Sequence, residues 1–144
     1  MGKTGKSERS KAKKKAWEAF SRWIRLRDSD ERGICRCITC PKRAHWKDMD
    51  AGHYITRAKE SVLFDPQNVH AQCGGCNQFQ GGKALEYRVE LIRRYGQWVV
   101  EKMEHTALMA CKRDVFDYQH IQAEAQKKTE AILAAHPQKA ERPQ

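Results

Sequence analysis

Apolar residues recur at helical spacing near the start of the chain, but only after its first fifteen residues. Between residues 16 and 27, Trp17, Phe20 and Ile24 lie three or four positions apart, while several arginines occupy the other positions. This pattern predicts an amphipathic helix with a basic side. Residues 1–15 carry seven Lys or Arg and one Glu without apolar periodicity. We therefore expect them to form a disordered basic arm.

The second half of the chain returns to helical periodicity. Residues 84–104 place Leu85, Val89 and Ile92 on one face, and Gly96 interrupts the pattern. A helix with a break at this glycine is therefore predicted.

A further helical segment and a tail complete the chain. Residues 105–136 are expected to be a C-terminal helical segment that ends before Pro137, and residues 137–144 are expected to be disordered. The apolar positions of this segment fit two interpretations, packing on the same domain or contact in a homodimer. These positions are Ile121, Ala125 and Ile132.

Residues 34–58 differ from both helical regions. They are rich in β-branched, aromatic and turn-forming residues, which is typical of short strands joined by tight turns. With helices on both sides, this segment predicts an α+β domain, which we assign to residues 16–104.

Composition and charge narrow the class of protein. The chain has 144 residues, of which 40% are hydrophobic and 32% charged, which is typical of a soluble globular domain. No apolar stretch is long enough to cross a membrane, and the basic N-terminus lacks the apolar segment of a secretory signal. We therefore expect a cytoplasmic protein. The net charge of +10 favours a polyanionic partner such as DNA, although a solvated basic surface also fits.

Four of the six cysteines form two Cys-x-x-Cys pairs separated by 32 residues. Such pairs place two thiolates on one tight turn, and four thiolates complete a tetrahedral site for structural Zn²⁺. In a reducing cytoplasm metal ligation is favoured over disulfides. We predict that Cys35 and Cys111 are not ligands. The predicted zinc ligands are Cys37, Cys40, Cys73 and Cys76.

Three polar residues around the second cysteine pair are not required by structural zinc. They are His53 in "MDAGHYI", Asn68 in "NVHAQC" and Asn77 in "CGGCNQFQGGK". Their order and spacing resemble those of the HNH nucleases of the ββα-metal type. The resemblance implies a small zinc-stapled treble-clef or ββα-metal (HNH) core with flanking N- and C-terminal helices.

The resemblance extends to the NinG, or Rap, recombination proteins of lambda-like bacteriophages. It covers about residues 16–104 and rests on "AFSRWIRLRD", "CITC", "DAGHYITR", "NVHAQCGGCNQFQGG" and "YRVELIRRYGQ", which occur in the same order. It implies a structure-specific DNA endonuclease that acts on branched intermediates such as Holliday junctions and D-loops. For a phage protein, the expected location is the cytoplasm of the bacterial host.

The same resemblance implies the roles of the three polar residues. His53 would be the general base that activates water, Asn68 would fix the loop, and Asn77 would bind Mg²⁺ or Mn²⁺. Many HNH enzymes have a second metal ligand directly before the base, but Gly52 occupies that place here. Asp50 is the nearest carboxylate and our candidate second ligand. An exposed turn residue is the alternative interpretation of Asp50.

The remaining candidates are basic residues and one further histidine. Arg57 and Lys83 could contact DNA phosphates or could be ordinary surface charge. His70 fits either a role in the site or a structural one. The missing ligand at position 52 leaves a second function open, a zinc-stapled module that binds branched DNA without cutting it. In the basic arm, the predicted DNA contacts are Lys11, Lys13, Lys14 and Lys15.

Overall fold

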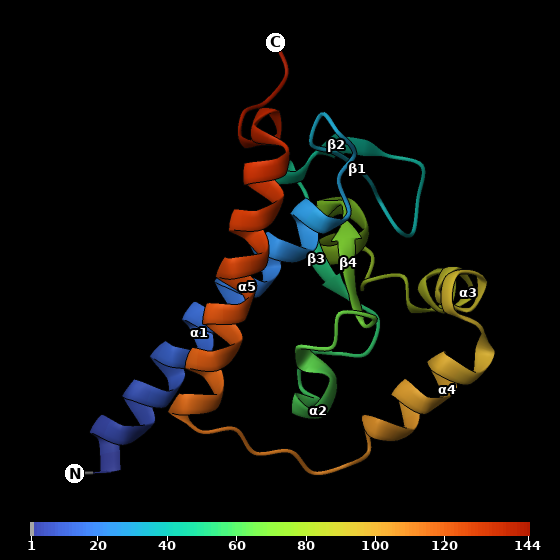
Figure 1. The fold of residues 1–144 in the computed structure, drawn as a ribbon. Coiled ribbons are helices and arrows are strands. Elements are labelled where there is room, and N and C mark those ends of the chain that lie inside the picture. Colours follow the sequence, from blue (N-terminus) through green and yellow to red (C-terminus); the bar gives the residue numbers. More distant parts are fainter. Residues whose placement is uncertain (1) are drawn as a thin grey trace.

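The computed structural model describes residues 2–144, with side chains from Ser7 onward, and has a mixed α and β architecture (Figure 1). The α+β class is therefore confirmed. In chain order the elements are α1 (Gly2–Arg27), β1 (Ile34–Arg36), β2 (Arg43–His45), the 3-10 turn η1 (Trp46–Asp48), β3 (Asp50–His53), α2 (Glu60–Leu63), β4 (Val69–Gln72), the π-helical turn η2 (Gly75–Phe79), α3 (Ala84–Tyr95), α4 (Gln97–Thr106), α5 (Val115–Ala135) and the 3-10 turn η3 (Pro137–Ala140).

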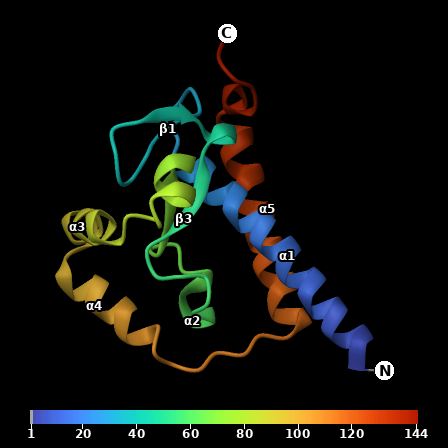
Figure 2. The ribbon, with the colours of Figure 1, turned by 180° about the vertical axis from the view of Figure 1, so that it is seen from behind.

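Two short antiparallel sheets lie between two groups of helices. Strand β1 pairs with β2, and β3 pairs with β4 in a register that sets Asp50 opposite Gln72 and His53 opposite Val69. Helices α1 and α5 lie together on one side of the sheets, and α3 and α4 lie on the other side, as both views show (Figures 1 and 2). The middle of the chain is thus held between the two helix groups.

The main core forms where α1 meets α5 and the β3–β4 sheet. Phe20 and Ile24 of α1, Tyr118 and Ala125 of α5, and Leu63 of α2 are all buried in one cluster. Burial of apolar side chains from both ends of the chain ties the termini to the centre. The C-terminal helix is therefore part of the same core and not a separate segment after residue 104.

The prediction of a disordered arm over residues 1–15 is wrong, because α1 begins at Gly2. Ala12 and Ala16 are buried and continue the stripe of Phe20 and Ile24 towards the N-terminus at intervals of four residues. Arg9 also donates a 2.7 Å hydrogen bond to the carbonyl of Arg113. Alanine is too small to give a strong apolar signal in the sequence, but a small residue allows α1 and α5 to approach closely.

The prediction of a disordered tail over residues 137–144 is also wrong. Pro137–Ala140 form the turn η3, and Lys139 is buried. The indole of Trp46 donates a 2.7 Å hydrogen bond to the carbonyl of Lys139, and Arg142 forms an ion pair of 2.7 Å with Asp48. The tail is therefore fixed by contacts with η1, which lies far away in the sequence.

The helical prediction after residue 83 holds only in part. Gly96 does interrupt the helix, between α3 and α4, with φ +89°. The predicted apolar face is wrong, because Leu85 and Val89 are exposed while Tyr87 and Leu91 are buried. The predicted face included only aliphatic residues, but the ring of Tyr87 contributes much buried area and takes a core position.

The C-terminal helix ends before Pro137, as expected. Helix α4 ends at Thr106, and α5 begins only at Val115, capped by Asp114. Ile121 and Ala125 pack in the main core. Ile132 packs against a second buried cluster that includes Leu26 and Trp46. The apolar positions of α5 thus follow the interpretation of packing on the same domain. No helix in residues 2–144 has the length and apolar content needed to cross a membrane.

Candidate metal centre and catalytic site

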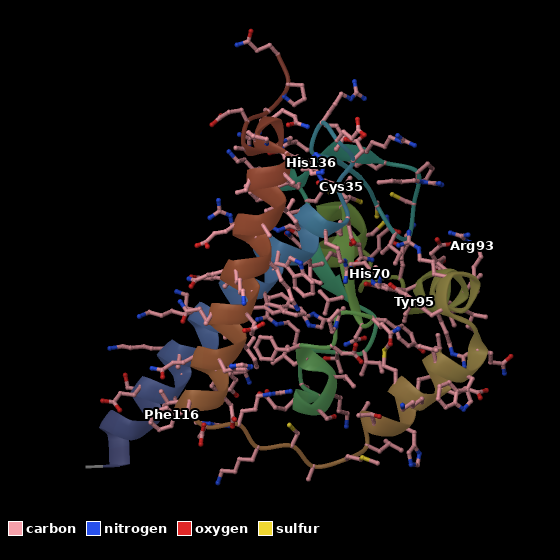
Figure 3. The ribbon with its side chains drawn as sticks, viewed as in Figure 1. Cys35, His70, Arg93, Tyr95, Phe116 and His136 are labelled. Atoms are coloured by element: carbon pink, nitrogen blue, oxygen red, sulfur yellow. The ribbon has the colours of Figure 1, made fainter. Side chains whose placement is uncertain are left out.

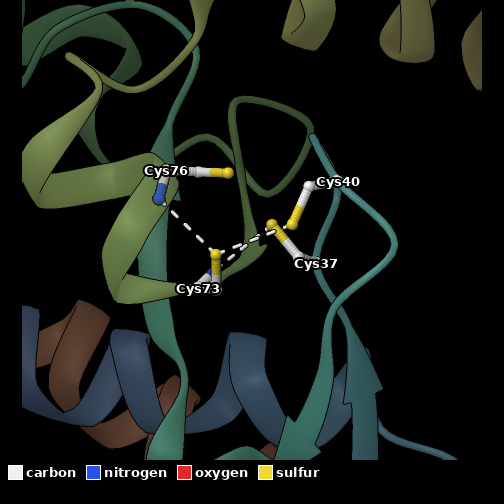
Figure 4. Close-up of side chains that lie close together, drawn as sticks. All are labelled: Cys37, Cys40, Cys73 and Cys76. Carbon is white, nitrogen blue, oxygen red and sulfur yellow. Dashed lines mark hydrogen bonds between the residues drawn. The ribbon is translucent and has the colours of Figure 1, made fainter.

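The four predicted zinc ligands come together at one point between the β1–β2 turn and η2 (Figure 4). Their sulfur atoms all lie within 4.8 Å of one another, and the Sγ atoms of Cys40 and Cys73 are 3.7 Å apart. Zn–S bonds of about 2.3 Å in a tetrahedron place neighbouring sulfurs about 3.8 Å apart. The cluster therefore has the dimensions of a structural Zn²⁺ site.

Backbone amides around the cluster point at its sulfurs. The Cys73 N–H donates to Cys37 Sγ over 3.2 Å, and the Lys42 N–H donates to Cys40 Sγ over 3.5 Å. Burial raises the pKa of Cys37, but the Cys73 amide and Thr39 outweigh it and lower that pKa to about 7. At Cys37 these donors favour the thiolate form that binds a metal, whereas burial raises the pKa of Cys40 to about 12 despite the Lys42 amide.

The two other cysteines stand apart from this cluster. Cys35 is buried, and its Sγ lies 3.2 Å from the carbonyl of Arg25. Burial raises the pKa of Cys35 to about 12, so it stays a neutral thiol. Cys111 is exposed after α4. Neither belongs to the group of four sulfurs, in agreement with the prediction.

Asp50 and Asn77 lie in contact, as a shared metal site would require. The Nδ2 atom of Asn77 donates to Asp50 Oδ2 over 3.0 Å, and Gln78 Nε2 donates to the same oxygen over 2.8 Å. Asn77 Oδ1 has no hydrogen bond among the described residues. Carboxylate and amide oxygens are the ligands that Mg²⁺ and Mn²⁺ prefer. The pair thus offers oxygen ligands of the right type at the start of β3.

His53 ends β3 in a largely apolar setting. Its ring stacks on Trp17 of α1 with centroids 4.8 Å apart, and its Nε2 lies 3.1 Å from the carbonyl of Leu63. A carbonyl can only accept, so Nε2 carries the proton and Nδ1 has the lone pair. Burial lowers the pKa of His53 to about 4, against the effect of the Leu63 carbonyl. The imidazole is therefore neutral at pH 7.

The structure does not bring His53 and Asp50 to the same face of β3. The strand is regular over Asp50–His53, so side chains three positions apart point to opposite faces. Ala51, on the face of His53, packs into the main core, whereas Asp50 faces η2. The turn at Ala51 and Gly52 that would join the two side chains does not occur. The expected single constellation is thus divided between His53 on one face of β3 and the Asp50–Asn77 pair on the other.

Asn68 holds the loop between β3 and β4. It is fully buried, and its Oδ1 accepts from the Ile55 N–H over 2.7 Å. Its Nδ2 donates to the carbonyls of Ile55 and Val62, each over 3.0 Å. Because its amide is engaged with the backbone, Asn68 can position the loop but has no donor left for a substrate.

His70 connects α3 to the strand that carries His53, and the sequence did not reveal this role. The Nε2 atom of His70 lies 2.8 Å from the Tyr95 hydroxyl, and Nδ1 lies 3.3 Å from the Tyr87 hydroxyl (Figure 3). Tyr87 donates its single proton to the carbonyl of Gly52 over 2.7 Å. His70 Nδ1 must therefore donate to Tyr87, and Nε2 must accept from Tyr95. This series of hydrogen bonds ends at the Gly52 carbonyl and so fixes the backbone directly before His53.

The predicted DNA-binding residues differ in their surroundings. Lys11, Lys14 and Lys15 are exposed on α1, but Lys13 forms a 2.9 Å ion pair with Glu60. Exposed cations suit phosphate contact, whereas the charge of Lys13 is already paired. Arg57 and Lys83 are also placed near the candidate site. The guanidinium of Arg57 lies 4.6 Å from the Trp17 ring centroid, and Lys83 precedes α3 with a left-handed backbone, φ +49°.

Acidification is expected to destabilise the fold through His53 and His70. Burial lowers both pKa values to about 4, while the unfolded value is about 6.5. As pH falls from 6.5 towards 4, the unfolded state binds protons that the folded state excludes, so the free energy of unfolding decreases. Each of the two histidines contributes at most about 1.4 kcal/mol per pH unit. Urea unfolding between pH 7 and 5 measures this slope.

Two substitutions assign the slope to individual residues. His70→Gln keeps polar groups but cannot titrate, so its slope between pH 7 and 5 should be shallower than that of the unaltered protein. His120→Gln is the control, because His120 is exposed on α5, and it should leave the slope unchanged. Equal slopes for all three proteins would contradict the assignment to His70.

The comparisons with known proteins agree on one family. The family model described as Bacteriophage Lambda NinG protein matches residues 3–134. Protein ninG of Escherichia phage 933W is 45% identical to the chain over 94 residues, and those of Escherichia phage lambda and Salmonella phage P22 are 44% and 43% identical over the same length. Each match covers 63% of this chain and 43% of the relative. The match thus spans less than half the length of these relatives. No solved structure matches the chain.

Proposed function

Because this chain belongs to the NinG family, we propose that it is a metal-dependent endonuclease of branched DNA, with Holliday junctions and D-loops as substrates. The order of elements supports a ββα-metal core of the treble-clef type. A cysteine turn lies between β1 and β2, His53 ends β3, Asn68 precedes β4, and Asn77 lies in the helical turn that follows. The zinc ligands join the first and last of these parts.

The state of His53 is the observation that carries the proposal. Its Nε2–H is held by the Leu63 carbonyl, and Trp17 supports the ring face. Nδ1 is therefore the atom that can take a proton from an attacking water. The low pKa keeps this atom unprotonated at neutral pH. Phosphodiester hydrolysis then requires the scissile phosphate to be held so that this water lies in line with the leaving oxygen.

Asn77 and Asp50 are the residues that would hold Mg²⁺ or Mn²⁺. Such an ion neutralises charge on the scissile phosphate and the departing oxygen. The zinc ligands would have a different role, because four sulfurs leave no open coordination position. The side chains of Asp50, His53 and Asn77 are all half-exposed. We propose that the DNA backbone passes over these three side chains at the two ends of β3.

A cleavage panel tests the proposal. Zinc-loaded protein is mixed with a labelled four-way junction, a D-loop and a linear duplex, each with Mg²⁺, Mn²⁺ or EDTA. We expect the branched substrates to be cut with either metal, and the duplex and the EDTA samples to remain intact. Binding of the junction without cutting in either metal would refute the nuclease.

A second function remains open, a zinc-stapled module that binds branched DNA without cleavage. The observation in its favour is the separation of His53 from Asp50 and Asn77 by the faces of β3. In this case the stack of His53 on Trp17 would serve packing alone, and the same panel would show shifted but uncut junctions.

Three exposed lysines of α1 are expected to contribute salt-dependent affinity for DNA. Replacing Lys11, Lys14 and Lys15 with Gln should reduce the slope of log K against log salt by up to about 2.7, because each phosphate contact contributes about 0.9. The loss should be similar for junction and duplex, since phosphate contacts do not select sequence or structure. Binding titrations at several salt concentrations measure the slope.

The matched control for this prediction lies on the same helix. Lys13→Gln removes one charge, against three in the triple substitution, but Lys13 is already paired with Glu60, so its slope should stay close to that of the unaltered protein and not fall by the roughly 0.9 of one phosphate contact. If the triple substitution leaves the slope unchanged, α1 does not contact DNA phosphates.

A further inference from the structure

The side chain of Phe79 projects into solvent from the same helical turn that carries Asn77. It is 84% exposed, the largest value among the exposed large hydrophobic residues. It ends η2, two residues after Asn77 and directly after Gln78, which donates to Asp50. Exposed apolar side chains are common in proteins, so exposure alone assigns no role. The high exposure of this ring at the end of the turn that carries Asn77 is the feature that needs an explanation.

The backbone around Phe79 is held in place on both sides. Before it, the Asn77 N–H donates to the Cys73 carbonyl over 2.9 Å. After it, the Gly82 N–H donates to the Cys76 carbonyl over 2.9 Å, and the Gly82 carbonyl accepts from Gln72 Nε2 over 2.9 Å. The ring is therefore presented by a segment anchored to the zinc cluster. Because this backbone is already ordered, binding through Phe79 orders only its side chain and costs little conformational entropy.

The turn after Phe79 also has an unusual backbone. Three consecutive residues have positive φ, namely Gly81 at +61°, Gly82 at +80° and Lys83 at +49°. A left-handed conformation is uncommon for lysine and occurs often at functional sites. The turn reverses the chain directly after Phe79 and places the cation of Lys83 four residues from the ring. An aromatic ring followed closely by a cation is a combination found in sites that hold a base and its phosphate.

We propose that Phe79 stacks on a DNA base that is unpaired or unstacked at a branch point, and so makes the protein prefer branched DNA. This inference rests on the proposed function, and it names the group that selects the substrate. A continuous duplex has its bases stacked on one another, so exposing a base to Phe79 costs unstacking energy. A branch point already provides such a base. The stack would hold the strand beside Asn77.

A nucleic-acid base fits Phe79 better than a protein surface does. The chain has a net charge of +10, and Lys83, which is half-buried, lies four residues after Phe79. Aromatic rings combined with cations are typical of sites for unpaired nucleotides. Leu85 and Val89, in contrast, are exposed aliphatic residues one turn apart on α3, and such side chains offer no flat face for stacking.

The test measures binding in Ca²⁺ without Mg²⁺, so that cleavage plays no part. The ratio of the dissociation constants for a linear duplex and a four-way junction is determined by fluorescence anisotropy. Phe79→Ala should lower this ratio roughly tenfold by weakening junction binding alone, because a stack contributes about 1–3 kcal/mol per base. Phe79→Trp should restore it. Zinc content and the circular dichroism spectrum confirm that each variant is folded.

Two control variants make the test specific to the Phe79 ring. Trp98→Ala removes an aromatic side chain that is 70% exposed on α4, and Leu85→Ala removes an aliphatic one that is 82% exposed. Both should keep the ratio of the unaltered protein. An unchanged ratio in Phe79→Ala, or an equal loss in Leu85→Ala, would overturn the stacking role. A protein that binds junction and duplex equally would instead refute the proposed preference for branched DNA, and the inference with it.

Discussion

Replacing His53 with Ala is expected to lower the rate of junction cleavage by roughly 100-fold or more, the loss typical of a positioned general base. Zinc content, folding and junction affinity should change little, because a base acts in the transition state and adds little to ground-state binding. His53 also packs on Trp17, so its removal leaves a gap. His53→Gln fills more of that gap and should be equally inactive. Single-turnover rates with labelled junction measure both variants.

Asn77→Ala provides the contrast that separates a base from a metal ligand. It removes an oxygen next to Asp50 and should raise the Mg²⁺ concentration needed for cleavage. High Mg²⁺ or Mn²⁺ should therefore restore part of its activity, while no metal concentration should restore His53→Ala. A folded His53→Ala protein that cuts at the normal rate would exclude His53 as the base.

Loss of one zinc ligand is expected to unfold the centre of the domain. Cys73→Ser removes a sulfur that lies 3.7 Å from Cys40 and within 4.8 Å of all the others. Structural zinc contributes about 10–16 kcal/mol in small zinc domains, whereas a whole domain is stable by only about 5–15 kcal/mol. The variant should therefore lose its zinc and the fixed packing of β3 and β4. Zinc analysis and urea unfolding measure these effects.

The control for this substitution is the exposed cysteine. Cys111→Ser should retain one zinc per chain and unaltered stability, since Cys111 lies outside the sulfur cluster. A well-folded Cys73→Ser protein, or well-folded unaltered protein without zinc, would show that the fold does not depend on the metal.

Local patterns in the sequence predicted the parts of the structure that local chemistry determines. Each Cys-x-x-Cys pair forms its own turn, so the cluster of four followed from spacing alone. Gly96 has a positive φ, which is incompatible with a continuous α-helix, so the helix is interrupted there as predicted. The role of Asn68 in the loop was implied by the family resemblance and not by a local pattern, and its amide bonds to the backbone of Ile55.

The sequence could not predict features that depend on distant contacts. Helix α1 extends through the basic N-terminus because α5 covers Ala12 and Ala16, and neither alanine is a strong signal by itself. The tail is ordered by Trp46, which lies more than ninety positions away from Lys139. The division of His53 from Asp50 depends on the pairing of β3 with β4, which decides the face of every side chain. None of these contacts leaves a local trace in the sequence.

Single-turnover cleavage of a four-way junction by the zinc-loaded protein is the most direct test of the central claim. The account predicts Mg²⁺-dependent breaks near the branch point, with 3′-hydroxyl and 5′-phosphate ends, because water activated at His53 Nδ1 displaces the 3′ oxygen. The junction should remain whole in EDTA and with His53→Gln. A junction that is bound by the folded, zinc-loaded protein but stays uncut at every Mg²⁺ and Mn²⁺ concentration would contradict the claim.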